Sequence, residues 1–486
     1  MNHRSAVVLV VLAALSTLGS AATKPRTGSD PVEGYWLGTT GTDKERIDLG
    51  FEFRRNDAGK LVVRVTEPNM GYYGMDLGEA KRDRDRVMSE AVGLSLTLKG
   101  DTLNGTYPGP RGIATLQRVS QLPQQAPVPE VPTGPAPLWQ TRVGGQVYAA
   151  PIVADGVAYI GTTGGIFNAV TTDNGKIAWT FAAGGPIFGA AAVTGDAIYF
   201  VCDTGFLYRL ERASGKQVWR YDLGDRAMPR LLPHPSAGDW DWQAPQPVLA
   251  DGTVYVGSGD GSFHAVDAAN GQRRWRFATK GKIRTGAAID GARVVFGSAD
   301  HFLYSLDRAS GQQVWSYDSH ADVDGTPLVA GKRIYFGNRG VGLHALDAES
   351  GKELWRLYFW GSWVESTPTL QDGVLYIGSS DLGQVSAINP DDGHVLWRGD
   401  VYGWTFGTPV VNDDRLYSGT AGGTPYFIRH VAGFVTLDRK TGKMLTRWPF
   451  ADSGGYEWGI AGSPARSGDV VIVATIAGSL FAFPLR

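Results

Sequence analysis

Short stretches of alternating apolar and polar residues recur in the N-terminal region of the chain, and glycines separate them. Between residues 31 and 120 four such stretches read IDLGFEF, KLVVRVT, LSLTLKGDTLNGTY and IATLQRV. A period of two places successive side chains on opposite faces of a strand, with one face in a core. We therefore predict a small all-β domain, a barrel or a sandwich, over residues 31–120.

From residue 138 onward the alternation recurs in units of roughly 40 residues. Each unit reads as four strands, with Asp-Gly or Asn-Gly turns that favour tight hairpins. The last strand of seven units carries a tryptophan: Trp179, Trp219, Trp275, Trp315, Trp355, Trp397 and Trp448. The eighth unit ends in AGSLFAFPLR without one, whereas PLWQTRV, with Trp139, precedes the first unit. The pattern predicts an eight-bladed β-propeller over 138–486, in which strand 138–143 completes the last blade.

Two further segments complete the expected organisation. Residues 1–22 combine Arg4, an apolar run and the small residues Ser20, Ala21 and Ala22, as a secretory signal does. The run is too short to remain as a membrane span, and no cysteine follows it to carry a lipid anchor. Residues 121–137 hold six prolines and predict an extended linker. We expect a secreted protein, located in the periplasm.

Composition narrows the functional classes. The 46 basic and 48 acidic residues give a formal net charge of -2, and without a long block of one sign they do not indicate a nucleic-acid partner. The single cysteine, Cys202, has no disulfide partner and is expected to be a small buried hydrophobe. His264 and His344 recur at the repeat position of Asn168, so we interpret them as structural. No serine-hydrolase elbow or zinc-protease motif is present.

Tryptophans added to the repeat give the strongest functional signal. Six lie between the outer strand of one blade and the inner strand of the next: Trp240, Trp242, Trp360, Trp363, Trp404 and Trp458. In a propeller these connections share one face, around the mouth of the channel. Blades 4 to 6 add Arg284, Asp322, Asp324 and Glu365 there, and the long loop 418–433 is a candidate rim or lid.

Two interpretations of these tryptophans remain open. They either pack together as a cap over the channel or form a partly exposed aromatic site beside charged groups. The sequence favours the site, with these candidate binding residues: Trp240, Trp242, Arg284, Asp324, Trp363, Glu365, Trp404 and Trp458. No catalytic or metal-binding residue is assigned.

The unit GGIFNAVTTDNGKIAW and its copies resemble the repeat of pyrroloquinoline quinone (PQQ), or quinoprotein-like, propellers. The resemblance covers about 138–486. The family includes PQQ-dependent dehydrogenases and non-enzymatic members such as the outer-membrane assembly propeller lipoprotein. Through GYWLGTT, MGYYGMDL and GDTLNGTY, the N-terminal part resembles an accessory β domain of secreted bacterial hydrolases.

The resemblance also defines what is missing. The PQQ dehydrogenases carry two adjacent cysteines and a calcium site of Glu, Asn and Asp, and this chain shows neither set. The sequence therefore favours a non-enzymatic binding or scaffold protein without a cofactor, whose partner is an unidentified protein, small molecule or glycan. A PQQ-dependent oxidoreductase is the alternative, and a carbohydrate-binding or carbohydrate-active propeller is the third hypothesis.

Overall fold

The computed structural model describes residues 30–41, 46–107, 113–224, 230, 242–340, 342–359, 361–423, 430–452 and 457–485. The expected signal segment, Trp240 and Trp360 lie outside these residues. The chain divides into two compact units, one before Glu130 and one, containing the propeller, that begins there. Within the described residues, none of the helices has the length and apolar character needed to cross a membrane.

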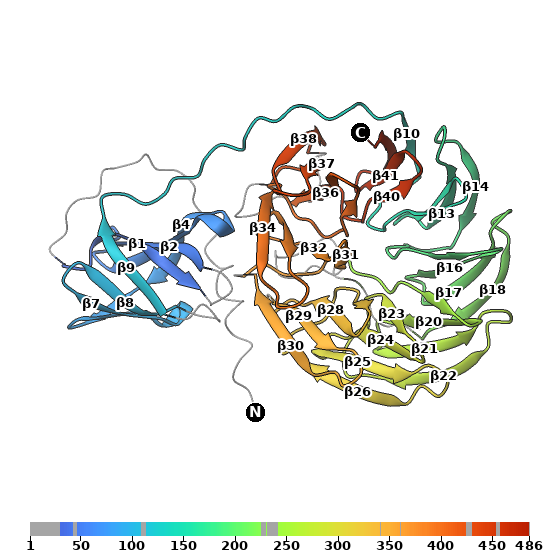
Figure 1. Ribbon diagram of the computed structural model, residues 1–486, viewed down its shortest axis with the longest axis horizontal. Coiled ribbons are helices and arrows are strands. Elements are labelled where there is room, and N and C mark those ends of the chain that lie inside the picture. The colour runs from blue at the N-terminus through green and yellow to red at the C-terminus, as the bar shows by residue number, and fades with distance from the viewer. Residues whose placement is uncertain are drawn as a thin grey trace. The chain divides into compact units, whose positions relative to one another are not determined.

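The N-terminal unit is a nearly closed barrel of nine antiparallel strands (Figure 1). Around the sheet the order is β4-β3-β2-β1-β9-β8-β7-β6-β5. The strands are β1 (Gly34–Gly41), β2 (Arg46–Arg55), β3 (Leu61–Glu67), β4 (Tyr72–Glu79), β5 (Lys81–Asp83), β6 (Arg86–Ser89), β7 (Leu94–Lys99), β8 (Thr102–Thr106) and β9 (Ile113–Val119).

Period-two alternation explains the barrel core. In β2, Ile47, Leu49, Phe51 and Phe53 point inward and are almost fully buried. They pack with Trp36, whose Nε1 donates a hydrogen bond to the Val32 carbonyl oxygen over 2.8 Å. The predicted all-β domain is therefore confirmed, and it is a barrel rather than a sandwich.

The second unit is a ring of eight antiparallel sheets, the blades of a propeller (Figure 1). Blades 1 to 4 contain β11 (Ile152–Ala154), β12 (Val157–Gly161), β13 (Ile166–Thr171), β14 (Ile177–Ala182); β15 (Ala192–Thr194), β16 (Ala197–Cys202), β17 (Phe206–Glu211), β18 (Gln217–Asp222); β19 (Val248–Ala250), β20 (Thr253–Gly257), β21 (Ser262–Asp267), β22 (Arg273–Ala278); β23 (Ala287–Asp290), β24 (Arg293–Gly297), β25 (Phe302–Asp307), β26 (Gln313–Asp318).

Blades 5 to 8 follow the same order from the channel outward. They contain β27 (Leu328–Ala330), β28 (Arg333–Gly337), β29 (Gly342–Asp347), β30 (Glu353–Tyr358); β31 (Thr369–Gln371), β32 (Val374–Gly378), β33 (Gln384–Ile388), β34 (Val395–Asp400); β35 (Val410–Val411), β36 (Arg415–Gly423), β37 (Gly433–Asp438), β38 (Met444–Pro449); and β40 (Ala465–Ser467), β41 (Val470–Thr475), β42 (Ser479–Pro484). The two middle strands of a blade are buried on both faces because neighbouring blades cover them, whereas outer strands such as β14 alternate with solvent.

The eighth blade is completed by a strand from the start of the propeller. β10 (Trp139–Arg142) pairs antiparallel with β42, from Trp139 opposite Ala482 to Arg142 opposite Ser479. This is the predicted closure. It joins the two ends of the ring and leaves no open edge between the first and last blades.

The repeated tryptophans hold each blade to the next. Trp179 donates from Nε1 to the Arg212 carbonyl oxygen of blade 2 over 3.1 Å. Its ring lies against Gly215, where an added Cβ would come within 2.4 Å of the indole. Equivalent bonds to the following blade are made by Trp139, Trp219, Trp275, Trp315, Trp355 and Trp397. The structural role expected for these tryptophans is confirmed.

In blade 7 the tryptophan is shifted from its frame position. The cause is contact with residues 131–135, here called the linker strap. Thr446 occupies the frame position, four residues after Gly442, and Trp448 comes two residues later. The strap runs parallel to β38, with the Arg447 N–H donating to the Pro132 carbonyl oxygen over 3.1 Å and the Gly134 N–H donating to the Arg447 carbonyl oxygen over 3.2 Å. Val131 packs against the core between blades 6 and 7. The end of the proline-rich segment is thus part of the propeller surface.

Three smaller expectations concern single side chains. Cys202 is fully buried in β16, as predicted. His264 and His344 are buried in β21 and β29, with the hydroxyls of Tyr221 and Tyr317 lying 3.1 Å and 3.2 Å from their Nδ1 atoms. These contacts join neighbouring blades, since Tyr221 lies in β18 and Tyr317 in β26, and they agree with structural roles.

Candidate functional site

The connections that enter each inner strand meet at one face of the ring, which we call the mouth face. The tight Asp-Gly and Asn-Gly turns lie on the opposite face because the strands of a blade alternate in direction. Blade 7 adds structure to the mouth face: β36 continues to Gly423 and pairs there with β39 (Glu457–Gly459). Trp404 bridges to Ala421 on the same extension. Part of the expected rim loop 418–433 is therefore strand, and residues 424–429 of it lie outside the described residues.

One residue from every blade faces the centre of the mouth at the same repeat position, three residues before the position of Pro151. We call this set the channel ring: Tyr148, Phe188, Ala244, Arg284, Asp324, Glu365, Phe406 and Ala461. Blades 4, 5 and 6 supply the charged members, and the other blades supply aromatic rings or alanine. The polar and apolar halves of the mouth are therefore set by substitution at a single repeat position.

Aromatic rings from distant blades pack together at the mouth. The Trp242 ring centroid lies 5.0 Å from that of Phe406 and 6.1 Å from that of Tyr148, which in turn contacts Phe188 at 5.5 Å. Trp404 joins the same cluster at 5.8 Å from Phe406, and its Nε1 donates to Asp381 Oδ1 over 2.9 Å. We call these five residues the mouth cluster.

A recognition site made by open aromatic faces would leave the candidate tryptophans exposed, but most of them are buried. Trp242 is 7% exposed, Trp404 2% and Trp458 9%, whereas Trp363 is only partly buried. Trp363 lies under the Arg339 guanidinium, whose carbon is 4.7 Å from the ring centroid. Tertiary packing has thus buried three of the four candidate tryptophans that the structure describes, and the rings of Trp242 and Trp404 cover the channel as a cap does.

The charged side of the ring is linked by one arginine. Arg339 Nε lies 2.7 Å from Asp324 Oδ2 and 2.8 Å from Glu365 Oε1. Burial raises the pKa of Glu365, whose side chain is only 1% exposed. Burial and the neighbouring charge of Asp324 also raise the pKa of Asp322, which lies 3.4 Å from His301 Nε2.

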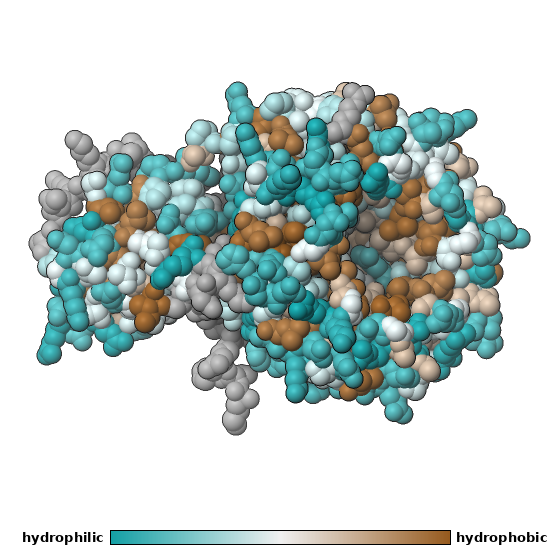
Figure 2. Space-filling view, viewed as in Figure 1, coloured by the Kyte–Doolittle hydropathy of each residue, from teal (hydrophilic) through white to brown (hydrophobic). Residues whose placement is uncertain are grey.

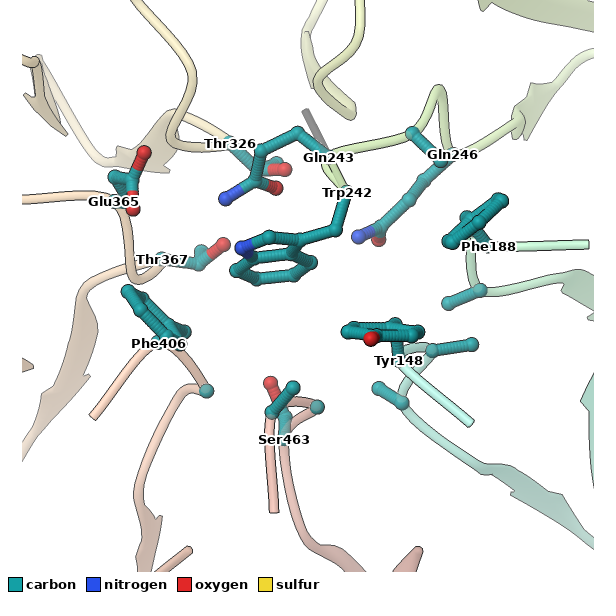
Figure 3. A pocket seen from close by; sticks show the side chains of 18 of the residues that line it. Tyr148, Phe188, Trp242, Gln243, Gln246, Thr326, Glu365, Thr367, Phe406 and Ser463 are labelled. Atoms are coloured by element: carbon teal, nitrogen blue, oxygen red, sulfur yellow. The ribbon is translucent and has the colours of Figure 1, made fainter. Parts of the chain in front are cut away.

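Between the rings of the mouth cluster and the charged side of the ring lies a small, mostly polar cavity of about 50 Å³ (Figure 3). The space-filling view shows the surface hollowed over the centre of the propeller (Figure 2). By the usual requirement of about 10–15 Å³ for each water, the cavity has room for three to five non-hydrogen atoms. Its walls include the side chains of Tyr148, Phe188, Trp242, Gln243, Gln246, Asp324, Thr326, Glu365, Thr367, Phe406 and Ser463.

Two polar atoms in the cavity wall have no hydrogen-bond partner. Trp242 Nε1 is a buried donor and Glu365 Oε2 a buried acceptor. Figure 3 shows the indole across the middle of the mouth, with its nitrogen on the side of Thr367 and Glu365. A buried polar group without a partner costs free energy, on the order of 1–3 kcal/mol. The pair therefore marks the place where a water or a ligand group would be most stabilised.

The candidate residues separate into three groups. Trp242, Asp324 and Glu365 line the cavity, and Trp363 and Trp404 pack in or against the mouth cluster without lining the cavity. Arg284, a member of the channel ring, and Trp458 are buried on the mouth face, and neither lines the cavity. Trp240 lies outside the described residues. Tyr148, Phe188 and Phe406 were missed, although the alignment of repeats carries the signal, since they occupy the positions equivalent to Asp324 and Glu365.

The described residues offer no group of three or more His, Cys, Asp and Glu side chains arranged to hold a metal ion. The histidine at the mouth, His430, packs on the Trp404 ring at 4.0 Å, and burial lowers its pKa to about 3. The arrangement is suited to binding a small polar group.

Comparison with known proteins agrees with the propeller architecture. The family described as outer membrane protein assembly factor BamB matches residues 132–228, 203–359 and 342–486, which is more than half of the chain. BamB of Yersinia pestis is 26% identical over 147 residues, covering 28% of this chain and 35% of that protein. The chain thus spans about a third of the length of this curated relative.

Solved structures show the same fold. The crystal structure of BamB from Moraxella catarrhalis superposes with a TM-score of 0.55 at 21% identity, covering 71% of this chain and 96% of that one. The quinohemoprotein alcohol dehydrogenase of Comamonas testosteroni gives 0.56 at 14% identity, covering 72% and 76%. An enzyme and an assembly factor thus share this architecture, so the fold alone does not select between them.

Proposed function

The chain belongs to the family of the outer membrane protein assembly factor BamB, and from that membership we propose that it is a non-enzymatic scaffold of the cell envelope. In this role the propeller binds a protein partner through its mouth face. The signal-like N-terminus and the family both support an exported, periplasmic location.

One observation carries the proposal: the additions to the repeat converge on the mouth face. The described residues 242–247 before blade 3, the extension of β36 and strand β39 all contribute to that face, and Trp242, Trp404 and Trp458 come from them or beside them. On the opposite face the turns stay as short as the hairpins require. Added structure on one face of a rigid scaffold is typical of a binding surface.

Catalysis with PQQ is disfavoured by the fit of the site. PQQ is a flat tricyclic tricarboxylate, and pockets for ligands of that size generally exceed about 300 Å³. The rings of Trp242, Tyr148 and Phe406 fill the mouth and leave about 50 Å³. The carboxylates of Asp324 and Glu365 would also lie against the carboxylates of PQQ, and like charges repel. The residues present do not fit the cofactor, and we propose that none is held in the channel.

Copurification from the native envelope tests the scaffold role. The full chain should retain an envelope protein, and the double variant Lys280→Glu/His320→Glu should lose it, because these exposed residues lie in the mouth-face connections of blades 4 and 5. The matched variant Lys176→Glu/Lys216→Glu changes exposed residues in turns of the opposite face. Retention by the mouth-face variant together with loss by the matched variant would contradict the proposal, and so would capture of a glycan in place of a protein.

A further inference from the structure

We infer that the cavity at the channel mouth binds an α-amino group with its adjacent carbonyl, as found at the amino terminus of a peptide or in a free amino-acid amide. This deepens the proposed function, on which it rests, because it assigns a ligand chemistry to the same face. Two unpartnered atoms, the charges around them and the size of the cavity support this assignment.

The cavity wall holds one buried donor and one buried acceptor that lack partners. Glu365 Oε2 is a buried acceptor and Trp242 Nε1 a buried donor, and both belong to the wall of one cavity. A ligand that satisfies both must donate with one atom and accept with another nearby. An α-ammonium group donates to the carboxylate, and the carbonyl oxygen, three bonds from that nitrogen, accepts from the indole.

The charges around the cavity favour a positively charged ligand group. Arg339 is bonded to Asp324 and to Glu365 Oε1, whereas Glu365 Oε2 has no hydrogen-bond partner. Burial of a charged group is stabilised when an opposite charge with hydrogen bonds accompanies it. An ammonium group supplies both, whereas a water molecule supplies no charge.

The size and shape of the cavity also fit this group. Room for three to five non-hydrogen atoms matches the nitrogen, Cα, carbonyl carbon and oxygen of a first residue. A long side chain does not fit, so glycine or alanine is expected in the first position. Phe406 and Tyr148 border the same cavity on its apolar side and can cover the Cα. Capture of an amino terminus in a small polar site is a known recognition mode.

Calorimetric titration of the full chain tests the inference with four probes. Triglycine and glycinamide carry a free α-amino group beside a carbonyl, N-acetyltriglycine lacks the amine, and Nα-acetyllysine methylamide carries its ammonium on a side chain. The first two should bind, and the last two should bind at least about ten-fold more weakly, as expected for loss of a charged hydrogen bond. Preference for triglycine identifies a peptide terminus as the source, and preference for glycinamide a free amino-acid derivative.

Variants separate the two contacts from general effects on folding. Glu365→Gln should weaken triglycine binding by about ten-fold or more, and Trp242→Phe, which keeps a ring but removes the N–H, by about five-fold. Glu211→Gln and Trp275→Phe are matched controls, because both residues belong to the blade frame and neither lines the cavity, and should change the affinity by less than about two-fold. Should Glu365→Gln fail to fold, the comparison of triglycine with its acetylated form on the unaltered chain still decides.

Three results would overturn the inference. The first is equal binding of the free and acetylated tripeptides, and the second is stronger binding of the lysine derivative than of triglycine. The third is no binding of any probe at about 20 mM, a concentration well above a weak dissociation constant of about 1 mM. If no probe binds but the envelope partner still copurifies through the mouth face, the proposed function stands and this inference alone fails.

Discussion

The indole rings of Trp242 and Trp404 make the clearest prediction at the scale of single residues. Both are buried in the mouth cluster, and truncation of a buried tryptophan leaves a cavity that costs about 3–5 kcal/mol. Trp242→Ala and Trp404→Ala should therefore each lower the free energy of unfolding by about that amount, measured by denaturant titration of the full chain. The partly buried Trp363 is the control, since Trp363→Ala should cost less. Near-native stability of the first two variants would show that the rings are exposed, as the sequence alone suggested.

Buried His264 makes stability depend on pH. Burial lowers its pKa to about 4, whereas an unfolded histidine titrates near 6.5. Between these values the unfolded chain binds a proton that the folded chain does not, so stability is lost as the pH falls from about 6.5 toward 4. The full effect is about 3 kcal/mol. His264→Asn, which installs the residue found at the equivalent position 168, should reduce the fall in Tm between pH 7 and pH 4.5. An NMR titration of His264 with a midpoint near 6.5 would contradict this account.

The three charged members of the eight-residue channel ring could be predicted from the sequence, whereas its three aromatic members could not, for a physical reason. Asp324, Glu365 and Arg284 were predicted because they are charged residues in the connections that also carry the added tryptophans, whereas Tyr148, Phe188 and Phe406 look like ordinary core residues until repeat positions are aligned. The burial of Trp242 was not predictable, because it depends on Tyr148 and Phe406, which reach it from blades far away in the sequence.

Among the structural elements, β10 and the linker strap govern how the ring is closed. β10 completes blade 8, and the strap adds two main-chain hydrogen bonds to β38 together with the contact of Val131. Deletion of residues 1–129 should therefore leave the propeller stable, and deletion of 1–136 should cost about 2 kcal/mol, at about 1 kcal/mol for each hydrogen bond. Deletion of 1–145 should lower the Tm most, because it exposes the edge of β42. Thermal unfolding of the three truncations gives the order, and equal Tm values for the last two would contradict a stabilising role of β10.

The sequence repeat was sufficient to predict most of the strand arrangement of the propeller. The number of blades, the four strands of each blade, the hairpin turns and closure by 138–143 all followed from period-two alternation and the eight copies. The shifted Trp448 did not have a visible cause in the sequence. It follows from contact with the strap, which lies over Thr446, and such a contact between a linker and an outer strand leaves no periodic signal.

At the scale of the whole molecule, the proposed scaffold role predicts that PQQ is not a tight cofactor. The mouth cluster would have to be displaced to admit it, at a cost of several buried aromatic contacts of about 0.5–1.5 kcal/mol each beyond their buried area. Titration with PQQ and Ca²⁺, followed by absorbance and by dye-linked oxidation of alcohols or aldoses, should show neither stoichiometric binding nor turnover. Stoichiometric binding accompanied by turnover would establish an enzyme instead.

Site-specific photo-crosslinking in the living source cell tests most directly whether the mouth face binds the envelope partner. A photoreactive residue at position 320 lies on the mouth face, and one at position 176 lies on the opposite face, both at exposed sites. The account predicts a discrete crosslinked envelope protein from position 320 and none from position 176. Crosslinks of equal yield from both positions, or from position 176 alone, would contradict it.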